Sequence, residues 1–260
     1  MSGKQFAFLL VILSVLFSSC HKEKTAPFSL SFAFQVDGEA LQSDIRKYVN
    51  AAGNQYEVNE VMFFISNVSL YKSDGTVVTK DRIHYVDIDN PSTLDWDLGV
   101  IPQGDYTAIS FTFGLSDAQN RSNRFVNPPE CNMSWPEVMG GGYHYMKING
   151  KWLANDGQVK PFNLHTGRGQ LYNEEGEVTQ FVDNSFTVRL DAPFTAGKEG
   201  ELYQLVMNVN QWFNASQVFD LDEWGGSIMQ NQAAQEILKQ NGPYVYEFRK
   251  WKLRSIDTNI

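Results

Sequence analysis

Apolar and polar residues alternate over short stretches along most of the chain, and this period of two predicts β-strands joined by turns. Residues 28–36 are the clearest case, because their alternate positions are all apolar: Phe28, Leu30, Phe32, Phe34 and Val36. Further strands are predicted at residues 61–71, 77–79, 83–88, 106–113, 143–148, 162–166, 181–190 and 202–209, with an edge strand in residues 244–253. The Asn149-Gly150 pair predicts a hairpin turn after residues 143–148.

One helix is predicted near the C-terminus. Ser227 is a suitable N-cap, apolar residues follow it at helical spacing, and Gly242-Pro243 ends the segment. Turn signals recur too often for strand–helix–strand units. The predicted fold class is therefore all-β, a two-layer antiparallel β-sandwich with long loops and one short C-terminal helix.

The first residues are typical of an export signal. Lys4 precedes an apolar run at residues 6–17, shorter than the about 20 residues that span a bilayer, and Ser18 and Ser19 then precede Cys20. This order resembles a bacterial lipoprotein signal, in which Cys20 becomes the lipidated first residue. Plain secretion, with Cys20 lost or left free, is the alternative. We therefore predict a signal peptide at 1–19, a tether at 20–27 and a β-sandwich domain at 28–260, in a lipoprotein of the outer membrane facing the periplasm or the cell surface.

The chain is acidic, with a formal net charge of −9, and no basic cluster interrupts this balance. Such a composition argues against a surface for nucleic acid or anionic lipid, so membrane attachment is expected through the lipid alone. If Cys20 is acylated, Cys131 has no partner for an internal disulfide. Its thiol is then either buried and inert or chemically used.

Two histidines are expected to meet on neighbouring strands. Alternation in residues 143–148 places His144 on one face with Met146 and Ile148, where an imidazole needs a hydrogen-bond partner or a metal. His165 lies on the following strand, so the two rings can face each other, which is a common way to begin a metal site. For His144 alone, a satisfied core histidine is the alternative. The remaining two histidines are interpreted as solvent-facing: His84 and His21.

The segment before these strands carries sulfur and indole groups. Cys131, Met133 and Trp135 alternate, so an extended segment would project all three side chains to one side. A thioether or thiolate beside imidazoles selects soft ions such as Cu(I). Alternatively, Met133 and Trp135 only plug the end of the sandwich. The three glycines at residues 140–142 allow positive φ and close backbone approach, as at a bulge or a site entrance.

Several short motifs follow one another between residues 28 and 238. They read EVNEVMFFISNVSLY followed by DGT, IPQGDYTAISFTFGL, an asparagine-bearing loop, MSW, GGGYHYMKING and FNLHTG. Their shared order and spacing resemble the MbnP-like family of copper-binding secreted proteins, which is similar to MopE and CorA of methanotrophs. The resemblance covers nearly the whole chain after the signal peptide.

This resemblance implies a β-sandwich that binds copper, as Cu(I) or Cu(II), through histidines and, in characterised relatives, through a kynurenine made by oxidation of a tryptophan. It implies that His165, within FNLHTG, is a ligand, that His144 is a second candidate with Met133 nearby, and that Trp135 is the candidate for kynurenine. Unmodified indole offers a metal no lone pair, whereas kynurenine has an aromatic amine. The implied partners are a di-haem peroxidase-like protein and an outer-membrane receptor.

The predicted function is therefore lipid-anchored copper acquisition or handling, without catalysis. A carbohydrate-binding surface lipoprotein is the alternative, because exposed aromatic rings outside the proposed site could stack on sugars: Trp96, Trp212 and Trp224. An enzyme has little support, since the chain lacks the G-x-S-x-G, H-E-x-x-H and C-x-x-C motifs. A thiolate–imidazole pair of Cys131 with His144 or His165 would have no visible group to orient the base.

Overall fold

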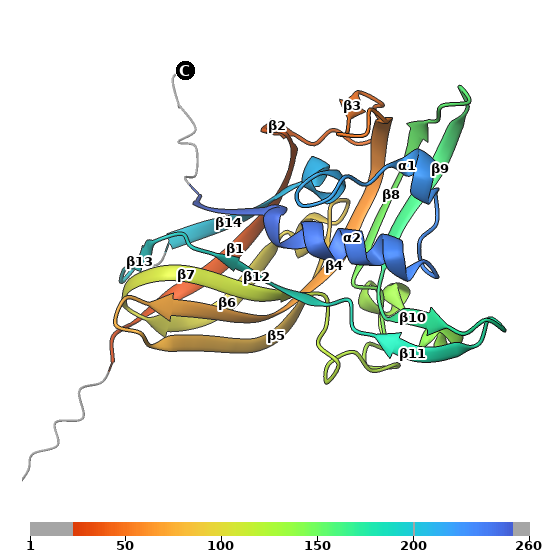
Figure 1. Cartoon of the computed structure of the whole chain (residues 1–260). Helices are drawn as coiled ribbons and strands as arrows, with labels where there is room; N and C mark the ends of the chain where they lie inside the picture. The colour runs from red at the N-terminus through yellow and green to blue at the C-terminus, as the bar shows by residue number, and fades with distance from the viewer. Residues whose placement is uncertain (1–22, 200, 252–260) are drawn as a thin grey trace, which may run out of the picture.

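A computed structural model of the chain describes residues 23–251 apart from residue 200, and its strands form two large sheets and a separate hairpin (Figure 1). The eight-stranded sheet runs in the order β12 (Phe186–Leu190), β7 (Gly104–Phe113), β4 (Gln55–Lys72), β8 (Met146–Leu153) and β9 (Val159–Thr166), with β13 (Phe194–Ala196) paired to β7, and β3 (Tyr48–Val49) and β5 (Val77–Asp87) paired to β4. The five-stranded sheet runs in the order β15 (Tyr246–Lys250), β14 (Glu201–Asn208), β1 (Thr25–Val36) and β2 (Glu39–Ala40), with β6 (Asp95–Pro102) paired to β1.

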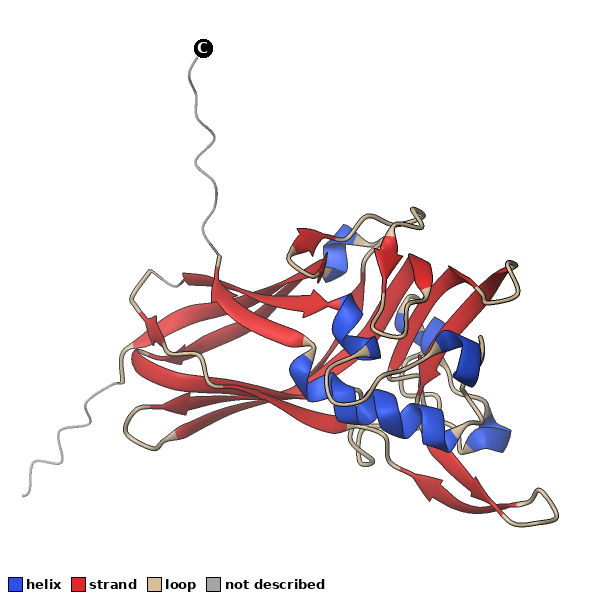
Figure 2. Ribbon diagram, turned by 45° about the horizontal axis from the view of Figure 1, so that its top comes forward, coloured by secondary structure: helices blue, strands red, loops and turns tan. Residues whose placement is uncertain are grey.

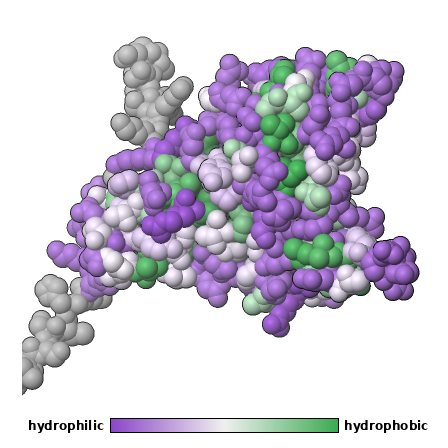
Figure 3. All heavy atoms as spheres, viewed as in Figure 1, coloured by the Kyte–Doolittle hydropathy of each residue, from purple (hydrophilic) through white to green (hydrophobic). Residues whose placement is uncertain are grey.

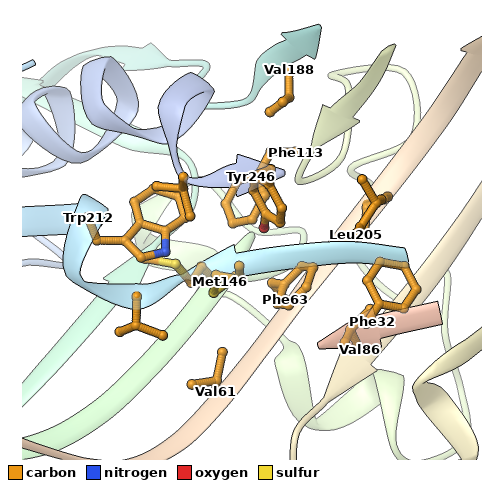
Figure 4. Packing of buried hydrophobic residues seen from close by; sticks show 14 of the residues in the cluster. Phe32, Val61, Phe63, Val86, Phe113, Met146, Val188, Leu205, Trp212 and Tyr246 are labelled. Carbon is orange, nitrogen blue, oxygen red and sulfur yellow. The ribbon is translucent and has the colours of Figure 1, made fainter. Parts of the chain in front are cut away.

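The two large sheets pack face to face around the main core, so the predicted two-layer β-sandwich is confirmed. Phe32 of β1 meets Phe63 of β4 with ring centroids 6.1 Å apart, and Phe63 stacks on Phe113 of β7 at 5.6 Å. Figure 4 shows these rings together with Leu205 and Tyr246 from the smaller sheet. Burying a side chain of this size stabilises the fold by about 1.5–3 kcal/mol.

One pair of strands departs from the antiparallel pattern. β1 pairs with β14 in parallel, from the position of Phe28 to that of Gln35, whereas the other strand pairs of both sheets are antiparallel. These two strands lie far apart in the sequence, so their pairing is not constrained by a hairpin turn. β1 also begins at Thr25, which places residues 25–27 in the sheet and not in a tether.

Short helices gather in the half of the molecule that contains β8 and β9 (Figure 2). The predicted C-terminal helix is α2 (Gln232–Asn241), but its N-cap is Asn231, whose side-chain oxygen accepts a hydrogen bond from the Ala234 amide at 3.1 Å. Ser227 instead bridges to Asn163, so its assignment as the cap is wrong. A single turn, α1 (Leu221–Trp224), and five 3-10 turns complete the described helices: η1 (Pro91–Thr93), η2 (Glu130–Met133), η3 (Glu137–Met139), η4 (Val209–Phe213) and η5 (Gly242–Tyr244).

Two predicted local features are wrong. The strand expected at residues 181–190 is divided between β11 (Val178–Val182) and β12. The two are separated because the Asp183 side chain accepts from the Ser185 amide in a turn, and the Asn184 side chain donates to the buried Gly167 carbonyl. The Asn149-Gly150 pair lies inside β8, and the turn follows later, around Gly157 with φ +79°. A Cβ at Gly150 would lie 2.1 Å from the Glu57 carbonyl oxygen, so this glycine serves close packing between strands and not a turn.

The remaining hairpin, β10 (Gly169–Tyr172) with β11, projects from the sandwich (Figure 1). The face in Figure 3 is largely hydrophilic, with separated green patches of hydrophobic residues. Among the described residues, no helix is long and apolar enough to cross a bilayer.

Candidate metal centre

A small loop that folds back on itself positions the candidate site in front of β8. The Trp135 amide donates to the Gly142 carbonyl at 2.9 Å, and the His144 amide donates to the Met133 carbonyl at 2.7 Å. An isolated bridge joins Ser134 and Tyr143 between them. This pairing brings the indole of Trp135 next to the imidazole of His144.

The three glycines form the turn of this loop, and all three adopt the positive φ that the sequence allows. Gly140, Gly141 and Gly142 have φ values of +102°, +63° and +85°. A Cβ at Gly142 would lie 2.2 Å from the side-chain oxygen of Asn120, which accepts a hydrogen bond from the Tyr143 amide at 2.8 Å. Glycine is therefore needed both for the backbone conformation and for the approach of Asn120.

The imidazoles of His144 and His165 meet, which confirms the predicted proximity. Their ring centroids lie 5.1 Å apart with the planes at 87°. The expected alternation does not extend to His144, because β8 begins only at Met146. Met146 packs in the main core, whereas the ring of His144 contacts Trp135 and His165.

His144 is buried, with 5% of its surface exposed, and its two ring nitrogens differ. Nδ1 lies 3.0 Å from the Met133 carbonyl oxygen, so Nδ1 carries the proton and donates to it. Nε2 is buried without a hydrogen-bond partner and keeps the lone pair. Burial lowers the pKa of His144 to about 3, with a further contribution from the charge of Lys147, so the imidazole is neutral at pH 7.

His165 is partly buried, and two linked side-chain hydrogen bonds orient its ring. Its Nε2 donates to the side-chain oxygen of Asn149 at 2.8 Å, and the Asn149 amide nitrogen donates to Glu60 at 2.5 Å. Because Nε2 carries the proton, the lone pair is on Nδ1. Burial, followed by the charge of Lys147, lowers the pKa of His165 to about 4, so this imidazole is also neutral.

Trp135 is packed tightly beside the histidines. Its ring meets that of His144 at 4.7 Å and 75°, and its Nε1 donates to the Met139 carbonyl at 3.1 Å. A Cβ at Gly167 would lie 2.6 Å from the indole, so the ring lies directly against the backbone that follows His165. The indole is 2% exposed and closes one side of the site.

The sulfur groups are placed differently from the prediction. Residues 130–133 form η2 and are not extended, so Cys131, Met133 and Trp135 do not project as one row. Met133 is 1% exposed and packs in a second apolar cluster with aromatic residues, which fits the alternative of a plug. It contributes its carbonyl to His144. The thiol of Cys131 is partly buried and lies 3.7 Å from the side-chain oxygen of Asn132.

His84 lies in a different part of the fold. The interpretation of His84 as solvent-facing is wrong: its ring stacks on Trp96 at 4.9 Å and on Phe32 at 5.5 Å, and Nε2 is hydrogen-bonded to the Thr93 carbonyl at 2.8 Å. His21 and Cys20 lie outside the described residues.

Three polar residues around the imidazoles were not found from the sequence: Asn149, Glu60 and Lys147. Lys147 faces His165 across the β8–β9 pair, and Asn149 lies two residues further along the same strand. The alternation of β8 places Lys147 and Asn149 on one face. Interpreting Asn149 as a turn residue concealed this relationship.

The spacing of the rings fits a shared ion. Two imidazoles that bind one ion at about 2.0 Å keep their ring centroids roughly 4.5–6.4 Å apart for bond angles of about 90–180°. The observed 5.1 Å lies within this range. Within residues 23–251, residue 200 aside, no group of three or more His, Cys, Asp or Glu side chains is placed to hold a metal. The described chain therefore offers two neutral nitrogen donors and no carboxylate.

The aromatic residues outside this site do not form an exposed platform. Trp96 and Trp212 are 4% and 1% exposed and belong to the main core, and Trp224 is partly buried against it. The alternative of a sugar-binding surface built from these three rings therefore lacks the exposure it requires.

Two comparisons with known proteins give a match, and both matches are to MbnP. A family model described as MbnP matches residues 25–230. The solved structure of MbnP from Methylosinus trichosporium aligns with a TM-score of 0.57 and 16% sequence identity, covering 88% of this chain and 100% of that chain. This structural similarity shows a shared fold. The comparison with curated proteins gives no match.

Proposed function

The chain belongs to the MbnP family, and from this premise we propose that it binds copper in copper acquisition or handling, with His144 and His165 as ligands. One observation carries the proposal: two neutral imidazoles lie 5.1 Å apart, and each has one nitrogen committed to a hydrogen bond while the other holds a lone pair. The lone pair of His144 is buried without a partner, which is costly unless a ligand uses it.

The donor set favours copper over hard cations. Calcium and magnesium require several oxygen ligands, which the two imidazoles do not supply. Imidazole suits copper. Both nitrogen donors are neutral, so no carboxylate compensates the charge of a bound Cu(I). The Met133 carbonyl and Asn149 act as outer partners that fix the protonated nitrogen and the orientation of each ring.

Trp135 is the proposed position of a kynurenine. Its ring lies 4.7 Å from that of His144, so a kynurenine at this position would lie against the imidazole pair. Its aromatic amine would derive from Nε1, which now donates to the Met139 carbonyl. Conversion requires an external oxidant, and a di-haem peroxidase-like partner would supply it. Mass spectrometry of the tryptic peptide containing Trp135 measures the outcome: a gain of about 4 Da supports the modification, and an unshifted peptide from protein purified from its native host contradicts it.

We further propose that the protein is held at the outer membrane by a lipid on Cys20, works with an outer-membrane receptor, and does not catalyse a reaction itself. The apolar run before Cys20 and the strand that starts at Thr25 support a short connection between lipid and domain. Labelling cells with a palmitate analogue tests the anchor. Wild type should be labelled and Cys20→Ser should not, whereas equal labelling would refute the assignment.

Competition against a chromophoric Cu(I) chelator tests the copper site. Wild type should bind about one copper ion, and His144→Ala/His165→Ala should weaken binding by at least about 100-fold, because both nitrogen donors are lost. His84→Gln is the matched control, since it removes a partly buried histidine that stacks elsewhere in the fold. Equal affinity of wild type and the double variant would refute the proposal.

A further inference from the structure

A single lysine lies beside both imidazoles of the candidate metal centre. Lys147 is the cross-strand partner of His165 in the β8–β9 pair. Its partly buried ammonium donates to the Asn132 carbonyl at 2.9 Å, and the next carbonyl along the chain, that of Met133, accepts from Nδ1 of His144. Two consecutive carbonyls of η2 thus hold the ammonium and the imidazole side by side.

The position of this charge is unusual for a site that receives a cation. The nearby carboxylate is Glu60, which is exposed and already accepts a hydrogen bond from Asn149. The cross-strand pairing with His165 and the consecutive carbonyls that bind Lys147 and His144 place both rings within the field of this charge. Burial is the main cause of the lowered pKa of each histidine, and the charge of Lys147 acts in the same direction. The same field acts on any ion bound between the rings, and it acts more strongly on a divalent ion than on a monovalent one.

We propose that Lys147 is a specificity-determining residue, whose fixed positive charge beside His144 and His165 discriminates against divalent ions in favour of monovalent Cu(I). The inference rests on the proposed function, because it assigns a selectivity to that same site. Lys147 is not a ligand in this proposal. It acts on the bound ion through space.

The size of the effect follows from the geometry. The two hydrogen bonds to consecutive carbonyls place the ammonium on the order of 7 Å from the His144 ring. At an effective dielectric constant of about 20, a unit charge at this distance changes the binding constant of a monovalent ion by about 50-fold. Solvent and salt around a partly buried lysine reduce this to about tenfold. The electrostatic free energy is twice as large for a divalent ion, so the ratio of divalent to monovalent binding constants changes by about tenfold.

The test compares Cu(I), measured anaerobically against a chromophoric chelator, with Zn(II), measured against a fluorescent chelator, on the same protein. Lys147→Gln removes the charge but keeps a donor for the Asn132 carbonyl, and Lys147→Arg keeps the charge. Lys151→Gln is the matched control, because Lys151 lies on the same strand, is 53% exposed and pairs with Glu57.

We expect Lys147→Gln to raise the ratio of Zn(II) to Cu(I) affinity by about tenfold, and Lys147→Arg and Lys151→Gln to leave that ratio within about twofold of wild type. The increase should shrink as salt is raised from 0.01 M to 1 M. An unchanged ratio in Lys147→Gln, or the same change in Lys147→Arg, would overturn the inference while the copper site stands. Wild type that binds neither ion more tightly than His144→Ala/His165→Ala would overturn the proposed function and this inference together.

Discussion

The stability of the metal-free protein should depend on pH through His144. In the folded state burial lowers the pKa of His144 to about 3, whereas an unfolded histidine has a pKa of about 6.5. At pH values between these two pKa values, the histidine is therefore protonated in the unfolded chain and neutral in the folded chain. The stabilising effect of the neutral ring is complete above about pH 6.5 and is lost progressively as the pH falls toward 3.

The magnitude follows from the linkage relation. Between pH 7 and pH 5 this single group should lower the free energy of unfolding by about 2 kcal/mol, because the unfolded histidine is mostly protonated at pH 5 and the folded one is not. His165, with its pKa lowered to about 4, should act in the same direction and with a similar size over this interval. Carboxylates also titrate near pH 5, so only a comparison with a variant isolates the histidine.

Urea denaturation of metal-free wild type and His144→Gln at pH 5, 6 and 7 measures the effect. The variant is expected to be less stable at pH 7, since it loses packing, but its stability should fall by about 2 kcal/mol less between pH 7 and pH 5. His84→Gln serves as a second reference, because it removes a partly buried histidine, whose pKa burial also lowers, from a different part of the fold. If wild type and His144→Gln lose the same free energy over this interval, His144 is not held neutral by burial and the assignment of its lone pair fails.

Three further results are expected. Asn149→Ala should weaken Cu(I) binding by about 10–100-fold in chelator competition, because the imidazole it orients is freed to rotate; unchanged affinity would exclude that role. Gly167→Ala should lower the free energy of unfolding in urea by about 1–3 kcal/mol, since its Cβ would lie 2.6 Å from Trp135, whereas Gly197→Ala, with open space around it, should have little effect. Cys131→Ser should leave Cu(I) affinity within about twofold, because the thiol faces an amide oxygen next to it; a larger loss would make the thiol a ligand.

The fold was largely predictable because period-two alternation reflects a sandwich with one buried and one more exposed face per strand. In β1, Phe28, Leu30 and Phe32 are buried, as their spacing predicts. Alternation carries no information about partners at long range, so the parallel pairing of β1 with β14 could not be predicted. The Asn149-Gly150 pair was misleading for a related reason: its glycine is needed for contact with Glu57 on the neighbouring strand, which a local turn rule cannot register.

The meeting of the two candidate imidazoles was predictable, but the groups that surround them were not. The meeting of His144 and His165 follows from their positions near the ends of consecutive strands. Which nitrogen of each ring keeps its lone pair does not follow from these positions, because it depends on the Met133 carbonyl for His144 and on Asn149 for His165. The thioether of Met133 was expected beside the rings, but the 3-10 turn η2 directs it into the aromatic cluster.

The two imidazoles are oriented by different kinds of structure, a pair of strands for His165 and a loop for His144. His165 lies on β9, the edge strand of the large sheet, and Asn149 lies on the adjacent β8, so the lone pair on Nδ1 of His165 is fixed when these two strands pair. The lone pair of His144 is fixed only when the loop containing η2 and the glycine turn docks, since its acceptor is a carbonyl of that loop. The packing of Met133 and Tyr143 in the second cluster supplies the apolar burial that keeps this loop in place. A copper ion held by both rings would link the loop to the sheet, so metal binding should stabilise the loop more than the strands beneath it.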